Sequence, residues 1–224
     1  MADDRATVLG AVRRALNREA GSDDRRRKSA AEQHLQARAV GPQPLPGENL
    51  IGAFTEHLEA AAATWARATA PAEAVHAVQE YARQAGQDTM IAADHPDLRH
   101  LPWPADLQPH FGAPADSGAC GLTLAELGIA ETGSLVLCAA PVTPTLYNFL
   151  PDILICLLST DAIVAHLEDA WRWLQSHRSP LPRAVNLVTG PSRTADVEQR
   201  LQLGAHGPRQ LHAILVDDGL RSPS

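Results

Sequence analysis

The turn after the apolar run at 184–188 combines residue types that bind anions. Residues 189–198 read TGPSRTADVE, so a strand is expected to end before Gly190 and a helix over 196–203 to follow. Backbone N–H groups at the start of a helix, together with a guanidinium such as that of Arg193, suit a carboxylate or a phosphate. The sequence therefore predicts a small-anion site formed by Gly190, Ser192, Arg193, Thr194 and Asp196.

Helix capping is a second interpretation of the same turn. The Thr194 hydroxyl would accept a hydrogen bond from the first turn of the helix, and Asp196 and Glu198 would interact favourably with the helix dipole. Capping needs no ligand, so the sequence leaves both interpretations open.

Two other polar turns supply candidate acid–base groups. Glu131 stands before Thr132 and Gly133, at the expected start of a strand over 134–140, and His206 stands before Gly207 in the segment GAHGP. A positioned glutamate can act as a nucleophile or base, and a histidine exchanges protons near neutral pH. We predict Glu131 and His206 as catalytic candidates, with structural hydrogen bonding within the loops as the alternative for both. The ligand-binding candidates in these turns are Thr132, Gly133 and Gly207.

These three turns are expected to meet in space. Each is polar, contains glycine and flanks an apolar strand, which places them at one edge of a sheet, where α/β proteins bind ligands. We therefore expect one anion pocket, in which Arg193 pairs with a carboxylate.

Apolar periodicity places the turns in an α/β domain. About six strands alternate with helices, which predicts a mainly parallel sheet covered on both faces, with an antiparallel hairpin as an option for residues 119–140. Residues 94–117 are expected to be a surface connection, and 125–132 a short helical or irregular turn. The expected strands cover 89–93, 119–124, 134–140, 153–158, 184–188 and 211–216, and 65–68 is a candidate for a further short strand. The expected helices cover 50–63, 71–85, 162–175 and 196–203.

The first 47 residues are expected to form a separate N-terminal helical arm. Helices are expected over 3–20 and 30–39, and the segment GPQPLPG at 41–47 is predicted to be an extended linker because it cannot continue a helix. The α/β domain is predicted to span 48–220. The basic run at 25–28 is interpreted as a solvated helix face, with a tail that contacts an acidic partner as the alternative.

Charge and composition exclude several classes of protein. The 224-residue chain has a net charge of −7, and its first 40 residues hold 9 basic and 6 acidic side chains, so the remainder is strongly acidic. An acidic body does not suit nucleic-acid binding. No apolar run approaches the ~20 residues of a membrane span, and the start MADDR lacks an apolar signal core. We therefore expect a soluble, cytoplasmic protein with no membrane insertion.

The cofactor chemistry open to this chain alone is narrow. Its three cysteines form no CxxC pair, whereas an iron–sulfur cluster usually needs four thiolates. Lys28, the single lysine, lies in a polar segment, which argues against a Schiff-base lysine, and the glycine-rich nucleotide motifs are absent. His95, His100 and His110 lack the spacing of a metal site. We expect no metal and no cofactor bound by this chain alone.

The C-terminal half resembles the LUD-domain family, and within it the lactate utilization protein C branch. The likeness rests on IAETGSLV at 129–136, on Leu150 and Pro151 before an apolar strand, and on TGPSRTAD at 189–196 followed by GAHGP at 204–208. It covers residues 118–217 well and residues 48–117 loosely.

This resemblance implies a three-layer α/β/α sandwich similar to the isomerase and CoA-transferase superfold (NagB/RpiA/CoA-transferase-like). It also implies a place in a system that oxidises L-lactate to pyruvate, in which partner proteins carry the iron–sulfur clusters and cysteine-rich repeats. In CoA transferases of similar fold a glutamate placed like Glu131 is the nucleophile, although likeness of fold is analogy only.

Two functions follow as expectations. The first is an accessory component that acts with iron–sulfur and cysteine-rich partners and binds a small carboxylate or phosphate. The alternative is a stand-alone enzyme or sensor for a small carboxylate, a phosphosugar or a CoA-type ligand. The sequence leaves open whether the chain catalyses a step by itself.

Overall fold

The computed structural model describes residues 2–16, 22–37, 40–44, 47–105, 108–112, 120–194, 202–203 and 207–220. The chain divides after Gln43 into two compact units, residues 1–43 and 44–224. The first unit holds two helices, α1 (Ala2–Ala15) and α2 (Ser22–Ala37). The basic run Arg25–Lys28 lies on α2 and is exposed, as expected for a solvated helix face.

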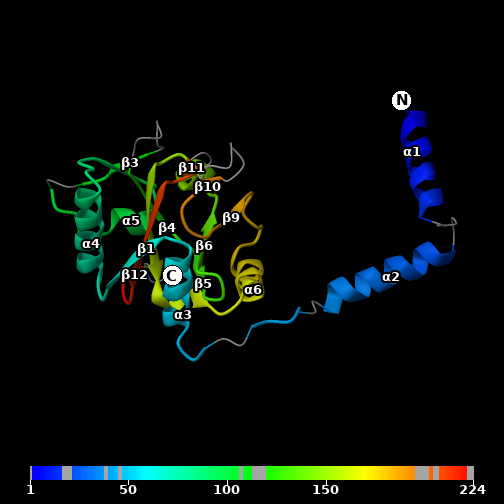
Figure 1. Ribbon diagram of the computed structural model, residues 1–224, viewed down its shortest axis with the longest axis horizontal. Helices are drawn as coiled ribbons and strands as arrows, with labels where there is room; N and C mark the ends of the chain where they lie inside the picture. Colours follow the sequence, from blue (N-terminus) through cyan, green and yellow to red (C-terminus); the bar gives the residue numbers. More distant parts are fainter. Residues whose placement is uncertain are drawn as a thin grey trace. The chain divides into compact units, whose positions relative to one another are not determined.

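A six-stranded sheet runs through the second unit, and all of its strands are parallel (Figure 1). Its order is β1-β12-β7-β4-β2-β3. Strand β7 is buried along its whole length and reads as the continuous apolar run ILICLLS, as is typical of a parallel strand covered on both faces. The strands are β1 (Thr64–Ala68), β2 (Met90–Ala92), β3 (His110–Phe111), β4 (Cys120–Leu124), β7 (Ile153–Ser159) and β12 (Gln210–Val216).

A second, four-stranded sheet has the order β8-β5-β6-β9. Strands β5 and β6 form an antiparallel hairpin, β9 is antiparallel to β6, and β8 is parallel to β5. The antiparallel hairpin considered for residues 119–140 is therefore confirmed. The strands are β5 (Leu127–Ile129), β6 (Ser134–Cys138), β8 (Ile163–Val164) and β9 (Val185–Val188).

Helices and the second sheet cover the two faces of the six-stranded sheet (Figure 1). On one face lie α4 (Pro71–Gln84), α5 (Pro96–Arg99) and the 3-10 turn η1 (Thr145–Asn148). On the other lie α3 (Leu50–Ala60) and the second sheet, with α6 (Leu167–His177) packed against that sheet. The predicted mainly parallel α/β fold is confirmed. The second sheet and α3 lie together on one face of the six-stranded sheet and form a single outer layer. Among the described residues no helix is long and apolar enough to cross a membrane.

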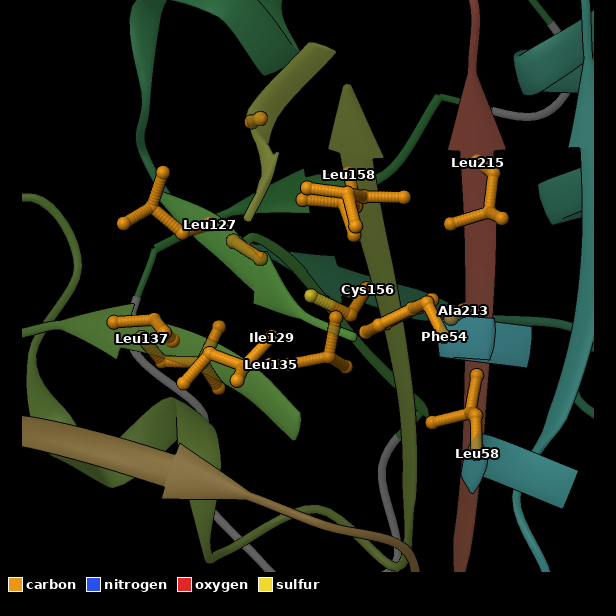
Figure 2. Close-up of a cluster of buried hydrophobic side chains, with 14 of the residues drawn as sticks. Phe54, Leu58, Leu127, Ile129, Leu135, Leu137, Cys156, Leu158, Ala213 and Leu215 are labelled. Carbon is orange, nitrogen blue, oxygen red and sulfur yellow. The ribbon is translucent and has the colours of Figure 1, made fainter. Parts of the chain in front are cut away.

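Alternating side chains divide the core into two clusters, one on each face of the six-stranded sheet. In β7, Leu154, Cys156 and Leu158 belong to the cluster on the α3 face, whereas Ile155 and Leu157 belong to the cluster on the α4 face. Figure 2 shows the first cluster, in which leucines and isoleucines of β5 and β6 meet β7, β12 and α3. The second sheet is therefore joined to the first by an apolar interface.

Local sequence signals set the ends of the helices that bear on the site. Asn49 begins α3, because its Oδ1 accepts the Gly52 N–H at 2.9 Å. Pro71 occupies the first turn of α4, and Gly86 follows its end with a left-handed φ of 71°. The helices predicted from Leu50 and from Pro71 are confirmed.

Short strands account for the errors of the sequence predictions. Residues 127–129, expected in an irregular turn, form β5, and Ile163, expected in a helix, lies in β8 before α6 begins at Leu167. Gln202–Leu203, expected at the end of a helix, form β11, which pairs antiparallel with β10 (Arg193–Thr194). The connection at 94–117 also contains α5 and β3. Segments of two or three residues carry no readable period, so pairing with a neighbouring strand decides their conformation.

Candidate functional site

The two principal turns predicted from the sequence meet at the second sheet. The turn 130–133 joins β5 to β6, and Thr189 and Gly190 follow β9, which pairs with β6. The Ser134 hydroxyl lies 2.5 Å from that of Thr189 and 2.7 Å from that of Thr132. We call these three residues the hydroxyl junction. The predicted meeting of the two turns is confirmed, but it occurs at the mostly antiparallel sheet.

Both glycines of these turns contact the backbone of α3 and of the residues that follow it. Gly133 has a φ of 65°, and a Cβ at this position would overlap the backbone nitrogen of Leu58. Gly190 has a φ of 80°, and a Cβ there would overlap the carbonyl oxygen of Ala61. Left-handed backbone and close approach each require glycine. Packing against α3 is thus a sufficient reason for both glycines.

The third predicted segment also lies beside the Gly190 turn. The Ser192 N–H donates to the carbonyl oxygen of Pro208 at 2.8 Å, and a Cβ at Gly207 would lie 3.3 Å from that of Ser192. The loop around Gly207 is therefore adjacent to the turn, as predicted. His206 itself lies outside the described residues.

Arg193 and Thr194, which follow the Gly190 turn, form the short strand β10, and the Arg193 side chain is exposed. Asp196 belongs to the stretch 195–201, which lies outside the described residues. The exposed guanidinium of Arg193 and the backbone of the turn are the described groups that an anion could contact here.

Glu131 is held by hydrogen bonds at the start of α6. Its Oε1 accepts the Leu167 N–H at 2.7 Å, and its Oε2 lies 3.0 Å from Nδ1 of His166. Its side chain is 16% exposed and that of His166 is 8% exposed. Asp169 completes the start of the helix, because its Oδ2 accepts the His166 N–H at 3.1 Å. The carboxylate therefore stabilises the N-terminal turn of α6 and orients a buried imidazole.

A second histidine contacts the same turn from α3. Nδ1 of His57 lies 2.9 Å from the carbonyl oxygen of Ala130, and the His57 side chain is exposed. His57 and His166 line a cavity of about 130 Å³ together with Glu131. We call it the Glu131 cavity; its other walls come from Pro44, Gly47, Leu50, Ala53, Ala130 and Ala165.

No direct signal in the sequence pointed to these two histidines. His57 stands 74 positions before Glu131, and His166 precedes a helix whose predicted start, at Ala162, was five residues too early. The one usable signal was the run HLED at 166–169, in which acidic residues follow a polar helix start.

A larger cavity, of about 430 Å³, lies at the carboxyl edge of the six-stranded sheet. Its walls include residues that follow β2, β4 and β12, the place where open α/β sheets usually bind ligands. We call it the carboxyl-edge cavity. Glu126 and Arg178 form an ion pair in its wall, and Asp97 adds a second carboxylate.

Cys138, in the wall of the same cavity, is a poor nucleophile. Burial and the neighbouring Glu126 carboxylate raise the pKa of its thiol to about 11, although Arg178 opposes this shift. Burial also raises the pKa of Cys120 to about 12 and that of Cys156 further. All three cysteines are free thiols. The described residues contain no group of three or more His, Cys, Asp or Glu placed to hold a metal ion.

A third histidine is buried in the six-stranded sheet, away from the predicted turns. Nδ1 of His212 lies 2.8 Å from the Thr64 hydroxyl, and its ring stacks on Tyr81 with centroids 3.8 Å apart. Its Nε2 is buried without a hydrogen-bond partner. Burial lowers the pKa of His212 to about 4, so the ring is neutral at physiological pH.

A comparison with known protein families identifies one family that this chain matches. The family model of the LUD domain matches residues 51–216, a range that includes both sheets and the three residues of the hydroxyl junction. The chain belongs to the LUD domain family. The predicted resemblance to this family and to its lactate utilization protein C branch is confirmed.

Several relatives of this LUD domain cover part of its length. Lactate utilization protein C of Bacillus subtilis (strain 168) is 30% identical over 119 residues, 52% of this chain and 50% of that protein. Lactate utilization protein C 1 of Bacillus mycoides is 33% identical over 107 residues, 46% of each chain. An uncharacterized protein of Neisseria meningitidis serogroup B is 36% identical over 96 residues, 43% of this chain and 41% of that protein. The chain thus matches about half the length of these relatives or less.

A solved structure supports the fold of this LUD domain. The crystal structure of a DUF162 family protein from Deinococcus radiodurans has a TM-score of 0.55 and 21% sequence identity, and the match covers 77% of this chain and 99% of that one. At this identity the likeness shows the fold alone.

Proposed function

We propose that this protein is a component of a lactate utilization system, which oxidises L-lactate to pyruvate with iron–sulfur partner proteins. The observation that supports this proposal is the LUD domain match over residues 51–216, together with relatives named lactate utilization protein C. The proposed ligand of this chain is a small carboxylate, bound where the turns of the second sheet meet.

The cysteines support a need for partners in electron transfer. The chain has three cysteines, and those on β4 and β7 are fully buried with raised thiol pKa values. Thiolates are the form that ligates iron–sulfur clusters, and four are usually required. Electron carriers of this kind are therefore proposed to reside on iron–sulfur and cysteine-rich partners.

Deletion and co-purification test this proposal. A strain that lacks the gene should fail to grow on L-lactate as sole carbon source but grow normally on pyruvate, and the intact gene should restore growth. Tagged protein from lactate-grown cells should recover an iron–sulfur protein in stoichiometric amount. Normal growth of the deletion strain on L-lactate would reject the proposed role.

The carboxyl-edge cavity favours a second candidate, a stand-alone enzyme or sensor. At about 430 Å³ it admits a ligand larger than a small carboxylate. Its wall presents the carboxylates of Asp97 and Glu126 against the single guanidinium of Arg178, which favours a neutral or cationic ligand over a phosphosugar or a CoA-type ligand. Turnover or tight ligand binding by the pure chain, with no partner recovered from cells, would support this candidate.

A further inference from the structure

Two histidines at the Glu131 cavity have fixed ring orientations. The His166 Nδ1 faces the Glu131 carboxylate at 3.0 Å, and the His57 Nδ1 faces the Ala130 carbonyl at 2.9 Å. Ionised carboxylates and carbonyls only accept hydrogen bonds, so each Nδ1 carries the proton and donates it. In the neutral ring of His166 the Nε2 atom then keeps its lone pair and can accept a hydrogen bond, whereas a protonated His57 ring would donate its Nε2–H to a carboxylate.

The two rings stand at different depths. The His166 side chain is 8% exposed, whereas His57 lies on the exposed side of α3, and both line the cavity. The cavity therefore has a buried end at His166 and a mouth at His57. An uncharged hydroxyl loses little by entering the buried end if it donates to a ring nitrogen, whereas a carboxylate is better placed at the mouth, where water still solvates it.

The size of the cavity limits its occupant. Water takes about 30 Å³ per molecule in the liquid, so about 130 Å³ has room for roughly four water-sized groups. The cavity therefore has room for a short-chain organic acid. The small side chains of Ala53 and Ala165 keep the walls apolar and leave this volume unfilled.

Capping of α6 does not by itself account for this arrangement. The Leu167 N–H is satisfied by one carboxylate oxygen of Glu131, and the His166 N–H by Asp169. Neither contact requires a buried imidazole bound to the second carboxylate oxygen, nor a second histidine across a cavity. A carboxylate behind a histidine holds the ring in one orientation, as in general-base pairs.

We infer that the Glu131 cavity binds a short 2-hydroxy acid, whose hydroxyl donates to Nε2 of His166 and whose carboxylate lies at the mouth beside His57. Glu131 acts here as a positioning residue. This inference rests on the proposed function, since it names the ligand class and the site, and lactate is the smallest chiral acid of this class. It concerns binding and the orientation of the hydroxyl group, and it includes no redox step.

Imidazole 15N NMR of the full chain tests the inference directly. L-lactate should shift the Nε2 resonances of His166 and His57, which are assigned by loss of signals in His166→Gln and His57→Gln. Propionate lacks the hydroxyl donor and should leave the His166 resonance in place. Absence of any L-lactate-dependent shift at both rings would overturn the inference, and so would an equal His166 shift with propionate.

Variants extend the test beyond a structural role of His166. In calorimetric titration, His166→Gln should weaken L-lactate binding roughly tenfold, the effect of one hydrogen bond to a basic group. Ala53→Leu fills the cavity without touching a polar group and should abolish binding, which keeps the test valid if His166→Gln does not fold. His76→Gln, at an exposed histidine of α4, is the control and should bind as the parent chain does. Parent-like binding by Ala53→Leu would reject this location.

Growth experiments separate this inference from the proposed function. If the deletion strain fails on L-lactate and a gene encoding Ala53→Leu restores growth in full, the proposed role stands and the cavity is not the lactate site. If the deletion strain grows normally, the proposed role fails whatever the titrations show.

Discussion

The two sheets of this protein differ in length of strand, direction and chemistry. The six-stranded sheet is wholly parallel, contains the long buried strands β7 and β12, and has a cavity of about 430 Å³ at its carboxyl edge. The four-stranded sheet has strands of two to five residues, mostly antiparallel, yet its turns carry nearly all the motif residues. The motif residues attach a small sheet to α3, so the sequence motifs and the carboxyl-edge cavity do not coincide in this chain.

Replacing Gly133 would break the attachment of the second sheet and should have the largest effect. Gly133→Ala places a Cβ against the backbone of Leu58 at a left-handed φ, and we expect a loss of roughly 3 kcal/mol or more in the free energy of unfolding. Gly86→Ala is the matched control, because its φ of 71° is similar but no atom lies within 4 Å. That variant should lose only about 1 kcal/mol. Equal losses in urea denaturation would show that backbone conformation, and not close packing, matters at Gly133.

Acid should weaken the six-stranded sheet through His212. The folded-state pKa is lowered from 6.5 to about 4, so above pH 6.5 the ring is neutral in both states and stability is unaffected. As the pH falls from 6.5 towards 4, the unfolded chain binds a proton that the folded chain does not, and on the order of 3 kcal/mol is lost. His212→Phe removes this titration and keeps a ring to stack on Tyr81. Its unfolding free energy should fall less steeply over that pH range, and an identical slope would contradict the assignment.

Glu131→Gln tests whether the Glu131 carboxylate, at the second sheet, contributes more to stability than the Glu126 carboxylate at the carboxyl-edge cavity. The amide keeps the size of the side chain but loses the charge that binds His166 and the start of α6, and we expect a loss of about 2 kcal/mol. Glu126→Gln, at the ion pair with the half-exposed Arg178, should lose less than about 1 kcal/mol. Thermal unfolding of both variants measures the difference; a larger loss for Glu126→Gln would reverse our ranking of the two sites.

Arg193→Ala should have the smallest effect on stability and isolates the anion site predicted from the sequence. Its side chain is exposed, so unfolding without ligand should change by less than about 0.5 kcal/mol. If an anion binds at the Gly190 turn, the rise in Tm caused by lactate or phosphate should disappear in this variant. Arg209→Ala, at another exposed arginine, should keep that rise. An unchanged response in Arg193→Ala would remove Arg193 from the binding site.

The parallel sheet was readable from the sequence because its signals are long and strong. The run ILICLLS predicted β7, and Pro71 and Gly86 marked the ends of α4. Half of the second sheet was hidden: β6 and β9 were expected, but β5 and β8 hold three and two residues and depend on pairing with neighbouring strands. Tertiary pairing, which a short segment does not encode, decided these elements.

The candidate site was predictable in part. The glycine-containing turns at Gly133 and Gly190 were expected to meet, and the Ser134–Thr189 hydrogen bond joins them. The reason for both glycines, contact with α3, depends on a helix more than 70 residues away in the chain and could not be read locally. The approach of His57 and His166 to Glu131 could not be read locally either, because the fold brings these residues together from α3 and from the start of α6.

The contacts of Gly133 and Gly190 with α3 have a consequence for motion. The backbone of these two glycines lies directly against the end of α3 and the residue that follows it, so we expect α3 and the second sheet to move together. Amide hydrogens in the last turn of α3 should then exchange with solvent together with those of β6, at a rate slower than that of an ordinary surface helix.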